Sequence, residues 1–278
     1  MRVFLILFLS FNVWATTTDQ IIHVPVNAIE KSSMTEKRFM EILDWFYAQY
    51  VDEIKARGAK LKIIPDWPES MANAFAQREE DTWIIRVLGG MARHPAVTED
   101  AFILVLCHEM GHHIGGAPKK KDFFSTSWAS DEGQADYWAT LKCTRKIWEQ
   151  DDNQMIIATM DIPKTLETEC DKSFSDKNES ALCKRVGMAS LSHARFLNRR
   201  DEIHTPVSFD TPSTREVRRT NHKHPKPQCR LDITFQASIC PINYQVDVSS
   251  TDASIGTCHE LNGHDRGKRP RCWYRFKP

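Results

Sequence analysis

After residue 14 the sequence contains no hydrophobic run long enough to cross a membrane as a helix. Its one strongly apolar stretch, Val3 to Trp14, follows Arg2 and precedes Ala15. Because a bilayer-spanning helix needs about 20 apolar residues, this stretch is too short, and its charged start and small final residue are typical of a secretory signal peptide. We therefore expect residues 1–15 to be removed and the mature chain to be periplasmic or secreted, without stable insertion in a membrane.

Net charge is also absent, because 37 Lys and Arg residues balance 37 Asp and Glu residues. Basic residues are concentrated between residues 199 and 230 and between residues 266 and 277. No aromatic-interleaved binding module accompanies these charges, so we expect no nucleic-acid partner. The chain has no internal repeat and no low-complexity segment, and 41% of its 278 residues are hydrophobic, which is enough to build a core.

Cysteine is present in number, and all eight cysteines lie after the expected signal peptide, as in proteins that fold in an oxidising compartment. Four of them crowd the last fifty residues: Cys229, Cys240, Cys258 and Cys272. Few large apolar residues accompany them, so this tail needs cross-links, and we expect the four to pair among themselves with three connectivities open. The partners of Cys143, Cys170 and Cys183 stay open.

The segment His108 to His112 is a His-Glu-x-x-His motif, the spacing with which a helix presents two imidazoles to one zinc ion. The two histidines lie about 40° apart around such a helix and roughly 6 Å apart along it. Glu109 points off that line and suits a role as general base, taking a proton from a zinc-bound water. Thr98 can cap the helix and Gly115-Gly116 can end it. The alternative is a core helix with chance histidines.

A catalytic zinc site needs a third protein ligand beside an open water position. Glu132 is the best candidate, because residues 130–139 predict a second helix with Ser130 as its cap. Asp136 follows one turn later and can accept a hydrogen bond from the outer nitrogen of a ligand histidine. Alternatively, both carboxylates are solvated charges on a helix surface.

Cys107 is harder to pair, because it directly precedes the first ligand histidine. If the second helix runs unbroken, Cys143 lies about 16 Å beyond Glu132 along its axis. A disulfide between Cys107 and Cys143 is therefore expected to be strained.

Together with three further segments, the motif resembles the zinc metallopeptidases that include the CAAX prenyl endopeptidases, the HtpX-like proteases and their soluble periplasmic relatives. Upstream, Asn73-Ala74-Phe75-Ala76 followed by a strand from Thr82 to Val87 is similar to the family's hairpin. Downstream, Glu132-x-x-x-Asp136 matches its third-ligand motif, and His224-Pro225 with Arg230 is similar to its late His-Pro-x-x-x-x-Arg element. The four elements occur in family order and cover about residues 70–230.

The ligand set that this resemblance implies for one zinc ion is His108, His112 and Glu132. It also implies Glu109 as general base. His224 and Arg230 are implied near the developing oxyanion. The strand from Asn73 to Ala76, which also contains Ala74 and Phe75, is implied as the edge along which a polypeptide substrate lies.

Two observations qualify the resemblance. Residues 221–228 are rich in His, Lys and Pro, so this late element has the alternative interpretation of a solvated loop. The chain also departs from the family's membrane members, because it has no later hydrophobic span and carries cysteines that those proteins do not need.

The remaining pattern predicts an α+β fold. Ser33 to Glu36 forms a capping box before a helix that ends at Gly58, and Lys60 to Ile64 predicts the first strand. The helix carries one apolar stripe: Phe39, Ile42, Leu43, Phe46, Tyr50 and Ile54. Ala181 to Arg200 predicts another amphipathic helix, and Leu231 to Phe235 looks like a strand.

Combined with the resemblance, this pattern gives a zincin of the gluzincin kind, with an active-site helix, an edge-strand sheet and a helical second half. We expect a metallopeptidase domain over residues 16–230 and a small disulfide-stapled appendage over residues 231–278. The expected function is that of an exported zinc-dependent endopeptidase, a hydrolase. The alternative is a catalytically idle zincin-fold protein that binds other envelope proteins or acts like a chaperone, and the intact Glu109 favours the enzyme. Peptide specificity and oligomeric state stay open.

Overall fold

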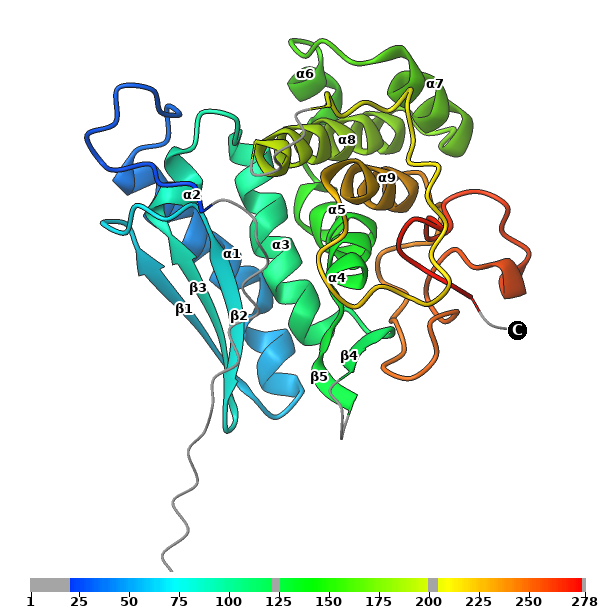
Figure 1. Cartoon of the computed structure of the whole chain (residues 1–278), viewed down its shortest axis with the longest axis horizontal. Coiled ribbons are helices and arrows are strands. Elements are labelled where there is room, and N and C mark those ends of the chain that lie inside the picture. Colours follow the sequence, from blue (N-terminus) through cyan, green and yellow to red (C-terminus); the bar gives the residue numbers. More distant parts are fainter. Residues whose placement is uncertain (1–20, 122–125, 200–204, 277–278) are drawn as a thin grey trace, which may run out of the picture.

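A computed structural model describes residues 21–121, 126–199 and 205–276. The expected signal peptide, residues 1–15, lies outside the described residues. The chain is a mixed α+β protein in which a small sheet lies on one side of a central helix and a helical half lies on the other (Figure 1). Among the described residues, no helix combines the length and hydropathy needed to cross a membrane.

Helix α1, Glu36–Ala56, contacts the sheet through the expected apolar stripe. All six stripe residues are buried and belong to the main core. The expected capping box at Ser33 is wrong, because the Thr35 side chain accepts the hydrogen bond of the Arg38 backbone N–H and caps the helix instead. A threonine adjacent to the first helical residue is closer to the unpaired N–H groups than a serine two positions earlier.

The sheet contains β1 Lys60–Asp66, β2 Ala74–Glu79 and β3 Thr82–Leu88. Strand β3 is central, parallel to β1 and antiparallel to β2, so β2 lies at an edge as expected. The hairpin between β2 and β3 turns at Glu80, whose φ of 51° is left-handed. The short helix α2, Gly89–Arg93, follows β3 and returns the chain toward the core.

Helix α3, Glu99–Ile114, is the central helix and is buried along almost its whole length. As expected, the Thr98 side chain caps it and it ends at Gly115. A small hairpin of β4 Lys119–Lys121 and β5 Thr126–Ser130 follows. The chain then continues as one helical run made of α4 Glu132–Trp138, a π-helical turn η1 Ala139–Cys143, and α5 Thr144–Trp148.

The second half is helical, as Figure 1 shows. It contains α6 Asn153–Ile157, α7 Lys164–Ser173, α8 Lys177–Asn198, α9 Pro227–Ser238 and the 3₁₀ turn η2 Glu260–Asn262. Helix α8 contains most of the expected amphipathic helix over residues 181–200 and begins four residues earlier.

The expected strand Leu231–Phe235 is wrong, because these residues lie within α9. Their alternation of apolar and polar residues suggested a strand, but the polar ones are buried and satisfied locally. Asp232 accepts hydrogen bonds from Gln228 and from the Ser213 backbone, and the Thr234 hydroxyl donates to the Arg230 carbonyl. The expected domain boundary between residues 230 and 231 thus falls inside this helix.

Four disulfides join the eight cysteines: Cys107–Cys143, Cys170–Cys183, Cys229–Cys272 and Cys240–Cys258. The last two confirm that the four C-terminal cysteines pair among themselves and fix the connectivity that the sequence left open. Cys229, in α9, ties that helix to the C-terminal segment. The segment also packs on α4, because Trp273 shares a buried cluster with Tyr137.

The prediction that a Cys107–Cys143 bridge would be strained is wrong, since their Cα atoms are 5.6 Å apart. The prediction assumed that the Glu132 backbone lies directly beside the His108 backbone, at the same height along the two helix axes. Helix α4 instead runs antiparallel to α3 and begins beyond the far end of the motif, where the Gln134 side chain donates to the Gly115 carbonyl. Successive residues of α4 and the run that follows it therefore lie beside earlier and earlier residues of α3, until Cys143 lies beside Cys107. The long Glu132 side chain reaches from the start of α4 to the two histidines.

Candidate metal centre

His108, His112 and Glu132 come together as a buried cluster whose ligand atoms all lie within 4.8 Å of one another. The Glu132 Oε2 atom lies 3.3 Å from His108 Nε2 and 3.7 Å from His112 Nε2. Among the described residues, no other group of three His, Cys, Asp or Glu side chains has this arrangement. The third ligand expected from the sequence is therefore placed beside the two histidines, although the structure does not identify the metal.

The close approach of α3 and α4 depends on Gly111, between the two ligand histidines. A Cβ at this position would lie 2.8 Å from the Ala135 carbonyl oxygen, closer than real Cβ atoms approach backbone.

Asp131 caps α4, because its side chain accepts the hydrogen bond of the Gln134 backbone N–H, so the expected Ser130 cap is wrong. Ser130 instead hydrogen-bonds through its hydroxyl to the Gly116 carbonyl, which fixes the chain just before the third ligand.

The Nδ1 atoms of both ligand histidines, which face away from Glu132, are within hydrogen-bond distance of an oxygen atom. His108 Nδ1 lies 2.7 Å from Asp136 Oδ1, and His112 Nδ1 lies 2.9 Å from the Ser130 carbonyl oxygen. Both contacts leave the Nε2 atoms facing Glu132. Asp136 therefore occupies the orienting position that the sequence predicted, one helical turn after Glu132.

Arg230 lies behind this arrangement. Its guanidinium donates two hydrogen bonds to Asp136, from Nε at 2.7 Å and from Nη2 at 2.6 Å. The same Nη2 lies 3.2 Å from His108 Nδ1, on the side of the imidazole that faces away from Glu132. These contacts make Arg230 a residue that holds Asp136, and its expected place near a developing oxyanion stays a prediction.

The two oxygens of Glu132 have different surroundings. Oε1 accepts a hydrogen bond of 2.8 Å from Lys120 Nζ, on β4. Oε2 is buried, accepts no hydrogen bond from a described residue, and has a third imidazole nitrogen, His224 Nε2, 3.2 Å away. A buried carboxylate oxygen without a donor is costly. Facing imidazole nitrogens, it fits a cation with nitrogen and oxygen ligands.

Charge states follow from burial and neighbours. Burial would raise the pKa of Glu132, but His112, His224 and His108 hold it well below its usual range. Burial lowers the pKa of His112 to about 3, so this imidazole is neutral and can offer its lone pair. Burial also lowers the pKa of His108, but Asp136 and Glu132 outweigh that effect and raise it to about 9. A metal would displace this proton.

Glu109 is buried beside the cluster, and burial raises the pKa of its carboxyl group. It forms no hydrogen bond to any described residue, so its oxygens are not committed to a structural role. His224 lies at the outer side of the cluster with 44% of its side chain exposed. The loop interpretation of residues 221–228 is correct for the backbone before α9, and this loop nevertheless brings an imidazole to the cluster.

Sequence reasoning missed two residues at the cluster, Lys120 against Glu132 and His222 against Asp131. Lys120 carried no signal, because a lysine on a short strand is ordinarily solvated. His222 lies 3.1 Å from Asp131, through Nδ1 and Oδ2. The spacing of His222 and His224 could have shown this, because alternate residues of an extended segment face the same side.

The substrate strand expected at Asn73 to Ala76 lies at the edge of the sheet, where β2 contacts α3. Asn73 directly precedes β2, and its side chain accepts the Ala74 backbone N–H. Its carbonyl oxygen accepts the Leu88 N–H, which closes the end of the hairpin. Phe75 and Ala76 follow within β2, half-buried.

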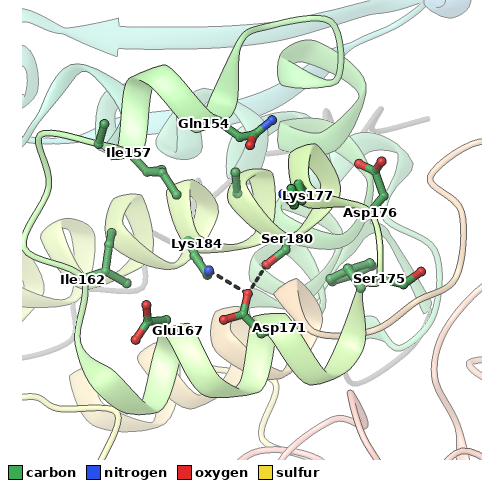
Figure 2. Close-up of a pocket in the computed structure, with 13 residues that line it drawn as sticks. Gln154, Ile157, Ile162, Glu167, Asp171, Ser175, Asp176, Lys177, Ser180 and Lys184 are labelled. Atoms are coloured by element: carbon green, nitrogen blue, oxygen red, sulfur yellow. Dashed lines mark hydrogen bonds and ion pairs between the residues drawn. The ribbon is translucent and has the colours of Figure 1, made fainter.

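A separate hollow of about 620 Å³ lies among α6, α7 and α8. Figure 2 shows that Lys184 and Ser180 both point to Asp171, at 2.7 Å and 2.6 Å, so these polar groups satisfy one another. The hollow contains none of the predicted site residues.

Neither a protein-family model, nor a curated protein, nor a solved structure matches this chain.

Proposed function

We propose that this protein is a zinc-dependent endopeptidase that uses Glu109 as its general base. The observation that carries the proposal is the buried Glu132 Oε2, which lacks a hydrogen-bond donor and faces the Nε2 atoms of His108 and His112. Two imidazoles and one carboxylate form a donor set that suits zinc and leaves a fourth position open. An uncommitted carboxylate, Glu109, stands beside that set.

Zinc held by these three residues would supply a Lewis acid that polarises a carbonyl group and lowers the pKa of water. The chain supplies the remaining steps. Glu109 accepts the proton of the attacking water and returns it to the leaving amine. Burial raises the pKa of Glu109, which favours its role as the group that accepts and returns the proton. In this proposal His224, which is exposed at the outer side of the cluster, donates a hydrogen bond to the developing oxyanion.

The proposal includes a zincin fold of the gluzincin kind, like the HtpX-like and CAAX prenyl endopeptidases that the sequence resembles. Support comes from the order of the parts: an edge strand, a helix with two ligands, a second helix with the third ligand, and a late histidine. We also propose that the chain is exported to a periplasm or secreted. The four disulfides support an oxidising compartment.

The substitution Glu109→Gln tests the mechanism, because the amide keeps the shape but cannot accept a proton. We expect zinc content and folding to be kept and hydrolysis of a quenched fluorescent peptide to fall by several orders of magnitude. Glu99→Gln, at the start of the same helix, is the matched control and should retain activity. Equal turnover by wild type and Glu109→Gln would contradict the mechanism.

The competing function is a zinc-loaded but idle domain that binds unfolded envelope proteins. In that case the wild type would bind denatured polypeptide without cleaving it, and Glu109→Gln would bind equally well. Measuring binding and cleavage on the same polypeptide separates the two functions.

A further inference from the structure

Four cations lie together on the loop that carries the two late histidines. Arg215, Arg218, Arg219 and Lys223 are exposed, and none forms an ion pair with a carboxylate of the described residues. The one acidic side chain among residues 215–223 is Glu216, which is paired with Arg271 at 3.1 Å. We call residues 215–223 the cationic loop. It lines a hollow of about 530 Å³.

The cationic loop adjoins the metal cluster. His222 contacts Asp131, the residue before the third ligand, and His224 contacts Glu132 itself. Lys223 is the residue between these two histidines, and its side chain is exposed.

The loop is also fixed in place. The Val217 backbone N–H donates to the Arg271 carbonyl, and the Asn221 backbone N–H donates to the Trp273 carbonyl. Trp273 in turn is buried against Gly133 in the first turn of α4, where a Cβ would lie 2.2 Å from its ring. The cations are therefore presented from a pinned backbone, which lowers the entropy lost when a ligand binds.

The four cations of the cationic loop have no partner carboxylate among the described residues. Glu216 is paired with Arg271, and three acidic groups at the metal cluster are buried and already matched: Asp131 by His222, Glu132 by Lys120 and the imidazoles, and Asp136 by Arg230. The chain as a whole has no net charge, so the loop is a local excess. A concentration of unpaired cations beside a site raises the local concentration of anionic ligands.

Resting on the proposed function, we propose that the preferred substrates are polypeptides with clustered Asp and Glu side chains, which the cationic loop binds beside the scissile bond. Carboxylates fit the site better than nucleobases do, because residues 215–223 contain no Phe, Tyr or Trp on which a base could stack. Arginine also pairs with carboxylates in a fixed two-point geometry.

Cleavage of matched quenched peptides tests this preference. The peptides share one neutral core and carry acidic, neutral or basic residues on the amino or carboxyl side of the cleaved bond. For at least one side we expect kcat/KM to be about tenfold higher with acidic than with neutral residues, since several exposed pairs each contribute a few-fold. The preference should shrink between about 0.1 M and 1 M salt, as the Debye length falls from about 10 Å to about 3 Å.

Charge reversal on the loop locates the effect. Arg218→Glu with Arg219→Glu should bring the ratio of acidic to neutral kcat/KM to about one or below. The control is Lys62→Glu with Lys177→Glu, which changes net charge equally at exposed, unpaired positions of β1 and α8. The control should keep the wild-type ratio.

A binding measurement separates this inference from the proposed function. Fluorescence anisotropy with the acidic peptide and the zinc-loaded Glu109→Gln protein reports recognition without cleavage. If the wild type cleaves acidic and neutral peptides equally, the inference is overturned and the function stands. If no peptide is cleaved but the acidic one binds through Arg218 and Arg219, the function fails and the inference about the loop stands. Binding of an oligonucleotide or heparin with no preference among peptides would also overturn the inference.

Discussion

Arg230 and Asp136 form a buried pair, joined by two hydrogen bonds of 2.7 Å and 2.6 Å. Asp136 uses one of the same oxygens to hold His108 Nδ1 at 2.7 Å. The pair therefore links α9 to α4 and α4 to α3 through a single carboxylate. Arg230 holds the pKa of Asp136 below its usual range, against the effect of burial, so the carboxylate stays charged behind the imidazole.

Asp136→Asn is expected to lower zinc affinity about 10- to 100-fold, because the amide no longer orients His108 as a charged acceptor. Competition with a chelating dye measures this affinity. Asp232→Asn is the control, since Asp232 is also buried but its hydrogen bonds go to Ser213 and Gln228, not to a ligand. The same affinity in wild type and Asp136→Asn would mean that Asp136 does not orient the ligand.

The wild type is expected to contain about one zinc per chain, and Glu132→Ala should lose most of it. The alanine removes the single carboxylate oxygen that faces both imidazoles. Elemental analysis of dialysed protein gives the ratio, with Glu167→Ala, at a half-buried position of α7, as control. A fully loaded Glu132→Ala protein would show that the third ligand is another residue, with Asp136 next in line.

His224→Ala should reduce kcat/KM about 10²-fold while zinc content stays near that of the wild type, if the imidazole donates to the oxyanion. Steady-state kinetics with parallel metal analysis separate this role from ligation. His264→Ala, in the C-terminal segment, is the control. Loss of zinc together with activity would make His224 a ligand, which its 3.2 Å contact with Glu132 would then explain.

Gly111→Ala should lower both the free energy of unfolding and zinc content. The added methyl group would meet the Ala135 backbone at 2.8 Å and force α3 and α4 apart. Gly187→Ala on α8 is the comparison, because the three atoms nearest to its Cβ would belong to the Leu166 side chain and not to backbone. Denaturant unfolding and metal analysis should rank Gly111→Ala as the more damaging change.

The non-reduced protein should contain no free thiol, and replacing Cys240 and Cys258 together by serine should cost about 2–4 kcal/mol of stability. These two cysteines lie in the C-terminal segment, where little apolar surface is available to replace a cross-link. Thiol titration of the denatured chain and denaturant unfolding measure the two quantities. Eight titratable thiols would contradict both the disulfides and the proposed export.

Local patterns in the sequence were sufficient to predict α1 with its stripe and α3 with the cap at Thr98, whereas the β2–β3 hairpin was expected from the family resemblance. Each of the two helices is set by spacing within a few residues, such as the i, i+4 relation of His108 and His112. Glu132 and Asp136 were also predictable, because a one-turn separation on a capped helix brings both side chains to the same face. The even cysteine count indicated disulfides, and the crowding of four cysteines indicated their pairing.

Tertiary structure alone decided the rest. The level at which α4 passes α3 brings Cys143 to Cys107, and no local pattern encodes the offset between two helices that are far apart in sequence. Helix α9 combines both levels, because its buried Asp232 accepts one hydrogen bond from Gln228 in the same helix and another from the distant Ser213 backbone. The contacts of Lys120 with Glu132 and of His222 with Asp131 have a tertiary origin: which side chains meet across a buried site depends on how separate segments pack, and spacing along the chain does not report it.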